Sequence, residues 1–337
     1  MQYRHLGRSH LKVSTLCLGT MMFADQTARD EAGRIVAHAH EHGVNFIDTA
    51  DIYSKGAAEA MVGALIKDRR HDWVLATKLG NAMSPRVNEG RYSRSWMMRE
   101  LAASLRRLQT DFIDIYYLHR DFEEQDLQEP VQALGDMVRQ GHIRYWGVSN
   151  FRGWRIAEAV HLAQRLGVPP PVVCQPYYTL LNRMPEVEVL PACHHHGIGV
   201  ASYSPIARGV LTGKYLPGAA PAALSRAGRS DRRIGETEMR PESLQIAQTL
   251  ARHAQERGVT LAQFATAWVL ANGILSSVIA GPRTLAQWQD YLPAVDFVLD
   301  AQDEAVVDAL VPPGHPSTPG YTDPAYPLTG RPTRRPQ

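Results

Sequence analysis

The chain alternates short apolar runs with longer segments of helical period, and this alternation constrains its fold more than any other sequence feature. The runs at 16–21 and 45–50 have the length and apolarity of buried strands, and segments 28–43 and 57–68 have helical spacing. The pattern continues along the chain and predicts about eight strands, nearly each followed by a helix. The further expected strands are 73–78, 112–119, 145–150, 171–176, 199–204 and 276–281.

Strands that are apolar on both faces belong in a parallel sheet that helices cover on both sides. A doubly wound open sheet and a closed (β/α)8 TIM barrel both fit this pattern. Eight repeats in about 280 residues favour the barrel, whose typical size is about 250 residues. A dinucleotide-binding doubly wound sheet also needs GxGxxG after its first strand, and "LCLGTMMFADQ" lacks it. We therefore expect a single barrel domain over residues 1–311.

Three segments depart from a plain barrel. "QYRHLG" and "LKVS", within the first fifteen or so residues, predict a β-hairpin that plugs the N-terminal face of the barrel. The stretch from 205 to about 240 is rich in Arg, Gly and Pro and long for a connecting loop, so we expect a lid. Residues 312–337 hold eight of the 22 prolines, which predicts an extended tail.

Charge and hydropathy exclude several classes of partner. The 36 basic and 34 acidic side chains give a net charge of +2, which offers no bulk attraction to nucleic acid or to a membrane surface. No apolar run reaches the roughly eighteen residues that span a bilayer, and the first residues lack a signal-peptide core. We therefore expect a cytoplasmic protein.

The cysteines and histidines do not predict a metal site. Three cysteines without CxxC spacing suggest neither a disulfide framework nor a zinc cluster. His194, His195 and His196 are consecutive, so on a helix they point about 100° apart and cannot converge on one ion. Gly197 follows them, which indicates the basic last turn of a helix.

Polar side chains stand at nearly every predicted strand end, and in a barrel these carboxyl ends meet at one rim. Asp48 ends the second strand with Tyr53 in the loop beyond it, Lys78 ends the third, and His119 ends the fourth. Later strand ends carry Ser149, Asn150, Gln175, Tyr203 and Ser204. One such residue is commonly a solvated edge residue, whereas the whole set on one rim indicates an active site.

A carboxylate, an ammonium group, a phenol and an imidazole on one rim favour proton transfer. A free tyrosine has a pKa near 10, and a neighbouring ammonium group lowers that pKa. We therefore expect a relay of Asp48, Lys78 and Tyr53, with His119 donating a hydrogen bond to a substrate oxygen. No Ser/His/Asp or Cys/His nucleophile accompanies them, which argues against acyl transfer. A metal-dependent hydrolase or isomerase would need a set of carboxylates or paired histidines at the strand ends, and the sequence does not place such a set there.

Seven segments in order resemble the aldo-keto reductases, and closest is the branch that contains the potassium-channel β subunits and bacterial reductases of similar length. They are "GVNFIDTADIYSKG", "VLATKLG", "IDIYYLH", "IRYWGVSN", "QPYYTLLNR", "SYSPIARGVLTGKY" and "IAGPRTLAQWQD". The resemblance runs from about residue 3 to residue 310. It implies a (β/α)8 barrel that binds NADPH without a Rossmann fold and reduces aldehydes or ketones to alcohols.

The resemblance also implies roles for individual residues. Asp48, Tyr53, Lys78 and His119 match the family's catalytic tetrad, in which Tyr53 would be the general acid and base. Other positions match the family's cofactor site. They are Thr20, Met21, Asp48, Ser149, Asn150, Gln175, Tyr203, Ser204, Pro205, Ile206, Ala207, Arg208, Gly209, Lys214, Gly281, Arg283, Gln287 and Asp290.

Within this set, Ser149, Asn150 and Gln175 would hold the carboxamide, and Tyr203 would stack on the nicotinamide ring. The loop 204–209 would wrap the pyrophosphate, with Lys214 as a further phosphate partner. At the adenosine end, a fork-shaped Arg283 beside a helix N-terminus suits a 2′-phosphate, so NADPH is expected over NADH. One departure from the family is Tyr291, where the usual residue is Asn, and it affects the adenine contact.

The expected partner is a small-molecule carbonyl compound, and a homo-oligomer is compatible with the sequence. The expected substrate walls are Met22, Phe23, Tyr53, loop 79–92, His119, Arg120 and Tyr177. The tail would fold back over the rim, where Tyr321 or Tyr326 would touch the substrate. The alternative function is a cofactor-binding regulatory or redox-sensing subunit like the channel β subunits, and the histidine at 119 favours a reductase.

Overall fold

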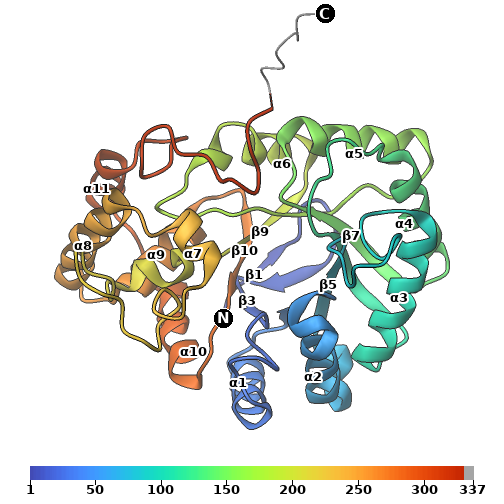
Figure 1. Cartoon of the computed structure of the whole chain (residues 1–337), viewed down its shortest axis with the longest axis horizontal. Helices are drawn as coiled ribbons and strands as arrows, with labels where there is room; N and C mark the ends of the chain where they lie inside the picture. The colour runs from blue at the N-terminus through green and yellow to red at the C-terminus, as the bar shows by residue number, and fades with distance from the viewer. Residues whose placement is uncertain (330–337) are drawn as a thin grey trace, which may run out of the picture.

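Eight parallel strands close into a barrel in the computed structural model, which describes residues 1–329 (Figure 1). The strand order around the barrel is β10-β3-β4-β5-β6-β7-β8-β9, so each strand pairs with its neighbours in sequence. The barrel strands are β3 (Leu16–Gly19), β4 (Phe46–Asp48), β5 (Val74–Leu79), β6 (Ile113–Leu118), β7 (Ile143–Ser149), β8 (Val173–Gln175), β9 (Gly199–Tyr203) and β10 (Leu275–Ala280). The predicted (β/α)8 TIM barrel is confirmed.

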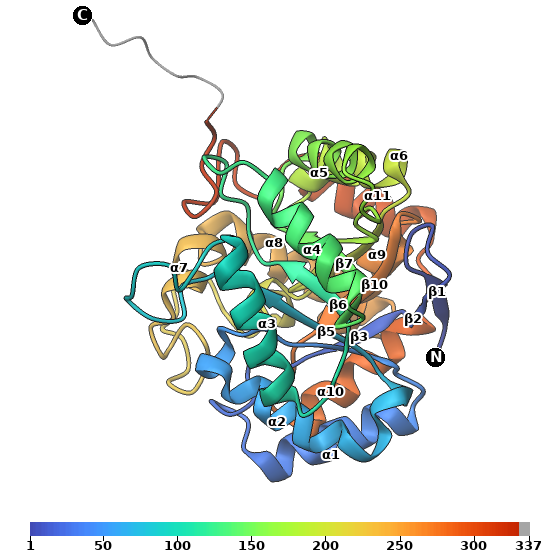
Figure 2. The same cartoon turned by 90° about the vertical axis from the view of Figure 1, so that its right-hand side faces the viewer.

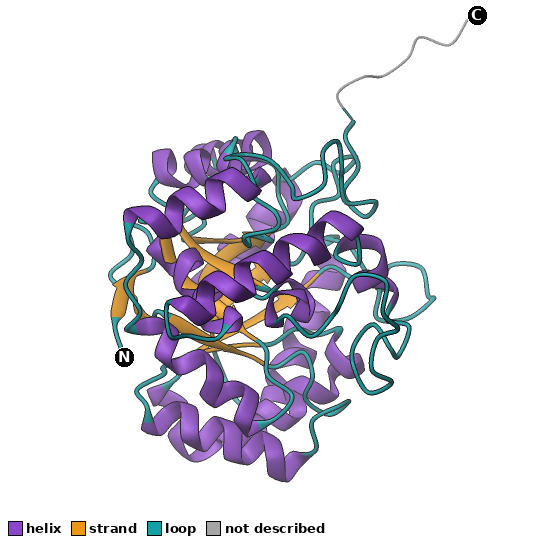
Figure 3. Cartoon of the chain, turned by 90° about the vertical axis from the view of Figure 1, so that its left-hand side faces the viewer, coloured by secondary structure: helices purple, strands orange, loops and turns teal. Residues whose placement is uncertain are grey.

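Helices surround the strands on the outside of the barrel (Figure 3). They are α1 (Arg29–Glu41), α2 (Ala57–Ile66), α3 (Arg94–Leu108), α4 (Gln128–Arg139), α5 (Gly153–Arg165), α6 (Val189–His196), α7 (Arg232–Thr237), α8 (Pro241–Glu256), α9 (Leu261–Ala271), α10 (Leu285–Tyr291) and α11 (Ala301–Leu310). As predicted, α6 ends in its three histidines, and Gly197 follows with a left-handed φ of 67°.

Two apolar cores follow from the alternation of side chains along each strand. One core lies between the barrel and its helices and includes Leu18, Ile47 and Leu75. The other fills the barrel interior and includes Cys17, Phe46, Ala76, Ile115 and Tyr117. Because successive strand residues point to opposite faces, the residue two positions beyond an interior residue also points inward. The position of the polar rim depends on this rule.

The predicted hairpin is β1 (Tyr3–His5) paired antiparallel with β2 (Lys12–Ser14). Leu6 and Val13 of this segment are fully buried and belong to the core of the barrel interior. The hairpin lies at the end of the barrel opposite to α7 and the C-terminal tail (Figure 2). It therefore closes the N-terminal face, as expected from the sequence.

Several helical segments were not predicted. The stretch 205–240 contains a short 3-10 helix, Ala207–Thr212, and α7. The helix α9 is buried along almost its whole length, so its sequence lacks the polar face that marks an amphipathic helix. The helix α11 begins at an Asp300 cap whose carboxylate accepts hydrogen bonds from the backbone N–H groups of Gln302 and Asp303.

The tail contains no helix over residues 312–329, in agreement with the prediction, and residues 330–337 lie outside the described part of the chain. Its Pro316 forms an isolated antiparallel β-bridge with Asn182, which lies in the loop after β8. The division into a barrel domain at 1–311 and a tail at 312–337 stays a prediction. Across residues 1–329, none of the helices has the length and apolarity that crossing a membrane would require.

Candidate active site

Three members of the predicted tetrad converge because they continue the inward-facing rows of the barrel interior. Asp48 lies two residues beyond Phe46, and Lys78 lies two beyond Ala76. His119 follows Tyr117 by the same interval, at the end of β6. All three side chains are therefore directed to the inside of the barrel at its carboxyl end.

Lys78 is the centre of this cluster. Its side chain is fully buried, and its Nζ donates to Asp48 Oδ2 at 2.5 Å and to the Thr49 carbonyl at 2.7 Å. The same Nζ lies 3.4 Å from the hydroxyl of Tyr53. Gln175 Nε2 donates to the other oxygen of Asp48 at 2.9 Å. Each charge of the buried pair thus has further hydrogen-bond partners, which such a pair needs to be stable.

Tyr53 is held by the loop that follows β4. It begins a short 3-10 helix, Tyr53–Gly56, in which Ser54 and Lys55 adopt left-handed φ values of 48° and 53°. The Ser54 hydroxyl donates to the Phe23 carbonyl at 3.0 Å and ties this turn to the loop after β3. The phenol ring is thereby placed over the barrel mouth, 6.0 Å from the ring of His119 between centroids.

The pKa values differ from the simple expectation for a tyrosine beside a lysine. Burial raises the pKa of Tyr53, and the Lys78 ammonium group lowers it by less, so the net shift is upward. Burial lowers the pKa of Lys78, but Asp48 and Tyr53 together raise it above its ordinary value of 10.5. At neutral pH the cluster therefore contains a charged lysine and a protonated phenol, which is the form that can donate a proton.

His119 is neutral at the same site. Burial, followed by repulsion from Lys78 and Arg120, holds its pKa well below its ordinary value of 6.5. Its Nδ1 is buried without a hydrogen-bond partner among residues 1–329. A neutral imidazole still donates from one ring nitrogen, so His119 retains the hydrogen-bonding capacity that the sequence predicted.

The next three strand ends form a connected polar network. Ser149 Oγ donates to the Gln175 carbonyl at 2.8 Å, and Asn150 Nδ2 donates to the His119 carbonyl at 3.0 Å. The Tyr203 hydroxyl donates to Asn150 Oδ1 at 2.8 Å. These contacts join β6, β7, β8 and β9 along one side of the rim.

A cavity of about 370 Å³ extends from this rim along the segment 204–240. Most of the predicted tetrad and cofactor residues line it. They are Thr20, Met21, Asp48, Tyr53, His119, Ser149, Asn150, Gln175, Tyr203, Ser204, Pro205, Ile206, Arg208, Gly209, Lys214, Gly281, Arg283, Gln287 and Asp290. Two predicted residues do not: Lys78 lies beneath the floor, and the buried Ala207 lies behind the wall.

The far end of the cavity is cationic. Lys214, Arg229 and Arg283 line it, and in the described part of the chain no carboxylate lies within ion-pair distance of them. Burial lowers the pKa of Lys214, and repulsion from Arg283 and Arg229 lowers it further. Sequence reasoning missed Arg226 and Arg229, which also line the cavity. The only sequence signal for them was the Arg-rich composition of 205–240.

The expected substrate walls are only partly present. Met22 lines the cavity, whereas Phe23 is buried beneath it and loop 79–92 and Arg120 do not line it. The Tyr92 hydroxyl of this loop donates to the Arg120 carbonyl and accepts from the Arg120 N–H. The Arg120 guanidinium carbon lies 5.6 Å from the centre of the Tyr326 ring. The substrate contacts of Phe23, the loop and Arg120 stay predictions. Tyr177 lies behind Tyr203 rather than on the cavity wall.

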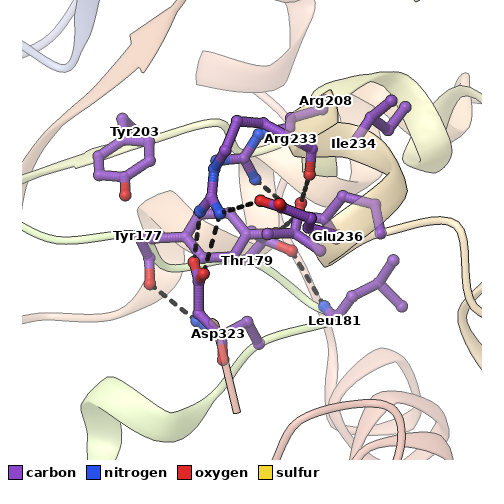
Figure 4. Close-up of polar contacts among 12 residues, drawn as sticks. Tyr177, Thr179, Leu181, Tyr203, Arg208, Arg233, Ile234, Glu236 and Asp323 are labelled. Carbon is purple, nitrogen blue, oxygen red and sulfur yellow. Dashed lines mark hydrogen bonds and ion pairs between the residues drawn. The ribbon is translucent and has the colours of Figure 1, made fainter. Parts of the chain in front are cut away.

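The tail crosses the rim, as expected, and Tyr326 lines the cavity. Arg233 of α7 binds both carboxylate oxygens of Asp323, at 3.0 and 2.6 Å, and also contacts Glu236 (Figure 4). Tyr321 does not line the cavity, because its ring packs on Arg240 and its hydroxyl donates to the Glu236 carbonyl.

The comparisons with known proteins agree with this geometry. The family model described as "Aldo/keto reductase family" matches residues 15–312. The chain belongs to this family. Its relatives include a protein named "Probable voltage-gated potassium channel subunit beta" from Arabidopsis thaliana, 39% identical over 88% of this chain and 92% of the relative.

Two further relatives cover almost the whole aldo-keto reductase chain. A protein from Oryza sativa subsp. japonica with the same name is 36% identical over 92% of this chain and 97% of the relative. The "Uncharacterized oxidoreductase YrpG" of Bacillus subtilis (strain 168) is 37% identical over 97% and 99%. Family membership indicates an oxidoreductase, and the family generally uses NAD(P)H. The roles of individual residues stay predictions.

The lowered pKa of His119 leads to a direct prediction. In NMR spectra recorded from pH 8 to pH 6, we expect the Cε1–H signal of His119 to stay at its neutral position, because protonation would place a cation beside Lys78 in a buried site. The signal is assigned by its loss in His119→Asn. A titration midpoint at or above 6.5 would contradict the proposed electrostatics.

Proposed function

We propose that this aldo-keto reductase reduces aldehydes or ketones to alcohols with NADPH, and that Tyr53 is the general acid. The observation that carries the proposal is the position of the Tyr53 hydroxyl, 3.4 Å from Lys78 Nζ and beside His119 at the mouth of one cavity. A protonated phenol next to a neutral imidazole suits protonation of a carbonyl oxygen.

The cavity residues fit a dinucleotide phosphate. The polar network of Ser149, Asn150 and Gln175 lies near the tetrad and suits the carboxamide of a nicotinamide ring. At the far end, Lys214, Arg229 and Arg283 leave positive charge unbalanced, as expected where phosphates bind. When bound there, NADPH would supply the hydride.

In the proposed mechanism, His119 and Tyr53 both donate hydrogen bonds to the substrate carbonyl oxygen. As negative charge develops on that oxygen, Tyr53 transfers its proton, and the nearby Lys78 ammonium group stabilises the resulting phenolate. Asp48 keeps Lys78 charged and fixed in place. In the reverse direction the phenolate would take the proton from the alcohol, so oxidation should become faster as the pH rises.

The relatives named as potassium channel β subunits favour a second function, in which bound cofactor regulates a partner protein. A regulatory subunit needs cofactor binding but not rapid turnover, whereas a reductase needs both. The complete set of Asp48, Tyr53, Lys78 and His119 supports the reductase. The cytoplasmic location and the identity of the carbonyl substrate stay predictions.

The first test replaces the proposed acid. Tyr53→Phe should reduce kcat for 4-nitrobenzaldehyde by about 10²–10⁴-fold, since the ring remains and only the proton donor is lost. NADPH consumption is followed at about 340 nm, the absorbance band of its reduced nicotinamide. Tyr145→Phe, on β7 away from the cavity, is the matched control and should behave as wild type. An unchanged rate in Tyr53→Phe would refute its assignment as the acid.

The second test concerns the 2′-phosphate. Arg283→Ala should weaken NADPH binding by about 1.5–3 kcal/mol, the usual value of a hydrogen bond to a charged group, and leave NADH binding nearly unchanged. Dissociation constants of both nucleotides are measured by quenching of protein fluorescence. Arg106→Ala, on the exposed face of α3, is the control. Equal losses for the two nucleotides would exclude Arg283 as the 2′-phosphate contact.

A further inference from the structure

Behind Tyr203 lies a second tyrosine that the proposed chemistry does not use. Tyr177 lies two residues beyond the end of β8, and its ring stacks on that of Tyr203 with centroids 5.5 Å apart and an interplanar angle of 27°. The backbone N–H of Tyr203 donates to the Pro176 carbonyl at 3.0 Å and fixes the two segments side by side. The orientation of Tyr203 therefore depends on where Tyr177 lies.

Tyr177 is held in turn by a buried carboxylate. Its hydroxyl donates to Glu238, which immediately follows α7 and is 1% exposed. Arg208 Nη1 donates to the same oxygen of Glu238 at 2.8 Å, and the guanidinium carbon lies 5.0 Å from the centre of the Tyr177 ring.

Arg208 itself lines the cavity. Through Tyr177 and Arg208, Glu238 is therefore connected to two separate parts of the site. One contact supports the ring pair of Tyr177 and Tyr203, and the other fixes a cation on the predicted pyrophosphate loop. The backbone of that loop is strained, because Ala207 and Arg208 have left-handed φ values of 47° and 50°. Such strain persists only where the surrounding contacts impose it, and the ion pair with Glu238 is one of those contacts.

Stability alone is a weak reason for this arrangement. A buried ion pair often contributes no more than apolar side chains of similar volume, because removing two charges from water is costly. The ion pair does fix the side chains of Arg208 and Glu238 in one geometry. Small displacements near a reacting centre lower the reaction rate strongly, because catalysis depends on the proximity and orientation of the reacting groups. The contacts of Glu238 therefore indicate a role in positioning.

We propose that Glu238 is a positioning residue for hydride transfer: it holds Tyr177 against Tyr203 and directs Arg208 to the cavity. The proposal rests on the proposed function, since Tyr203 matters in this way only if a nicotinamide ring stacks on it. Glu238 acts through Tyr177 and Arg208 and does not itself line the cavity.

The test is Glu238→Gln, which keeps the shape of the side chain and removes its charge. We expect kcat to fall by about tenfold or more, while the Kd for NADPH changes by less than about threefold, because Arg208 is still available to a phosphate. With NADPH deuterated on one face of C4, wild type should transfer hydrogen from a single face. Glu238→Gln should lose part of this stereospecificity, because Tyr203 is no longer fixed.

Two further variants separate positioning from folding. Tyr177→Phe keeps the stacked ring but loses the bond to Glu238, so we expect the same changes to a smaller degree. Glu256→Gln makes the same change of charge at an exposed position on the neighbouring helix α8 and should behave as wild type. Melting temperatures and the fraction of protein that binds NADPH correct each rate for loss of folded enzyme.

A second readout does not need turnover. The absorption difference spectrum of bound NADPH reports the surroundings of its nicotinamide ring, and Glu238→Gln should change it. If wild type binds NADPH but reduces no aldehyde, the proposed function fails, and this spectrum still tests Glu238. An unchanged spectrum and stereospecificity in Glu238→Gln, or a fall in kcat that only follows the loss of folded protein, would overturn the positioning role.

Discussion

The site depends on one buried ion pair, between Lys78 and Asp48. Both side chains are inside the barrel and almost inaccessible to solvent, so neither charge would be tolerated there without the other. Thr49 and Gln175 satisfy their remaining hydrogen-bonding capacity, and Tyr53 lies at the exposed side of the pair. The electrostatics of the phenol and of His119 follow from this arrangement, because both groups lie beside a fixed positive charge.

The barrel strands position the residues of the predicted tetrad, and the irregular segments form the walls of the cavity. Inward-facing side chains at the ends of adjacent strands bring Asp48, Lys78 and His119 together, and the loop after β4 adds Tyr53. The segment 204–240 and the tail then complete the cavity, the first with cations and the second with Tyr326. The helix α7 connects these parts, since Arg233 binds Asp323 of the tail and Glu238, just after the helix, binds Tyr177 and Arg208.

The sequence was sufficient to predict the barrel and the convergence of Asp48, Tyr53, Lys78 and His119 at its rim, because the carboxyl ends of parallel barrel strands meet there. It did not reveal α9, whose buried residues leave no polar face, or Arg229 and Glu238, which lie in segments without periodicity. The net pKa shift of Tyr53 was also beyond prediction. Its direction depends on the balance between burial and Lys78, and only the packed structure determines the degree of burial.

The most direct test of the central claim is a single-turnover experiment with NADPH deuterated at C4 and an aldehyde, comparing wild type with Lys78→Met. We expect wild type to form alcohol with deuterium on its carbinol carbon. Lys78→Met should bind NADPH with similar affinity but transfer deuterium at least about 10²-fold more slowly, since the phenolate of Tyr53 loses its stabilising charge. Equal transfer rates in the two proteins, or a wild type that binds NADPH without forming deuterated alcohol, would contradict the account.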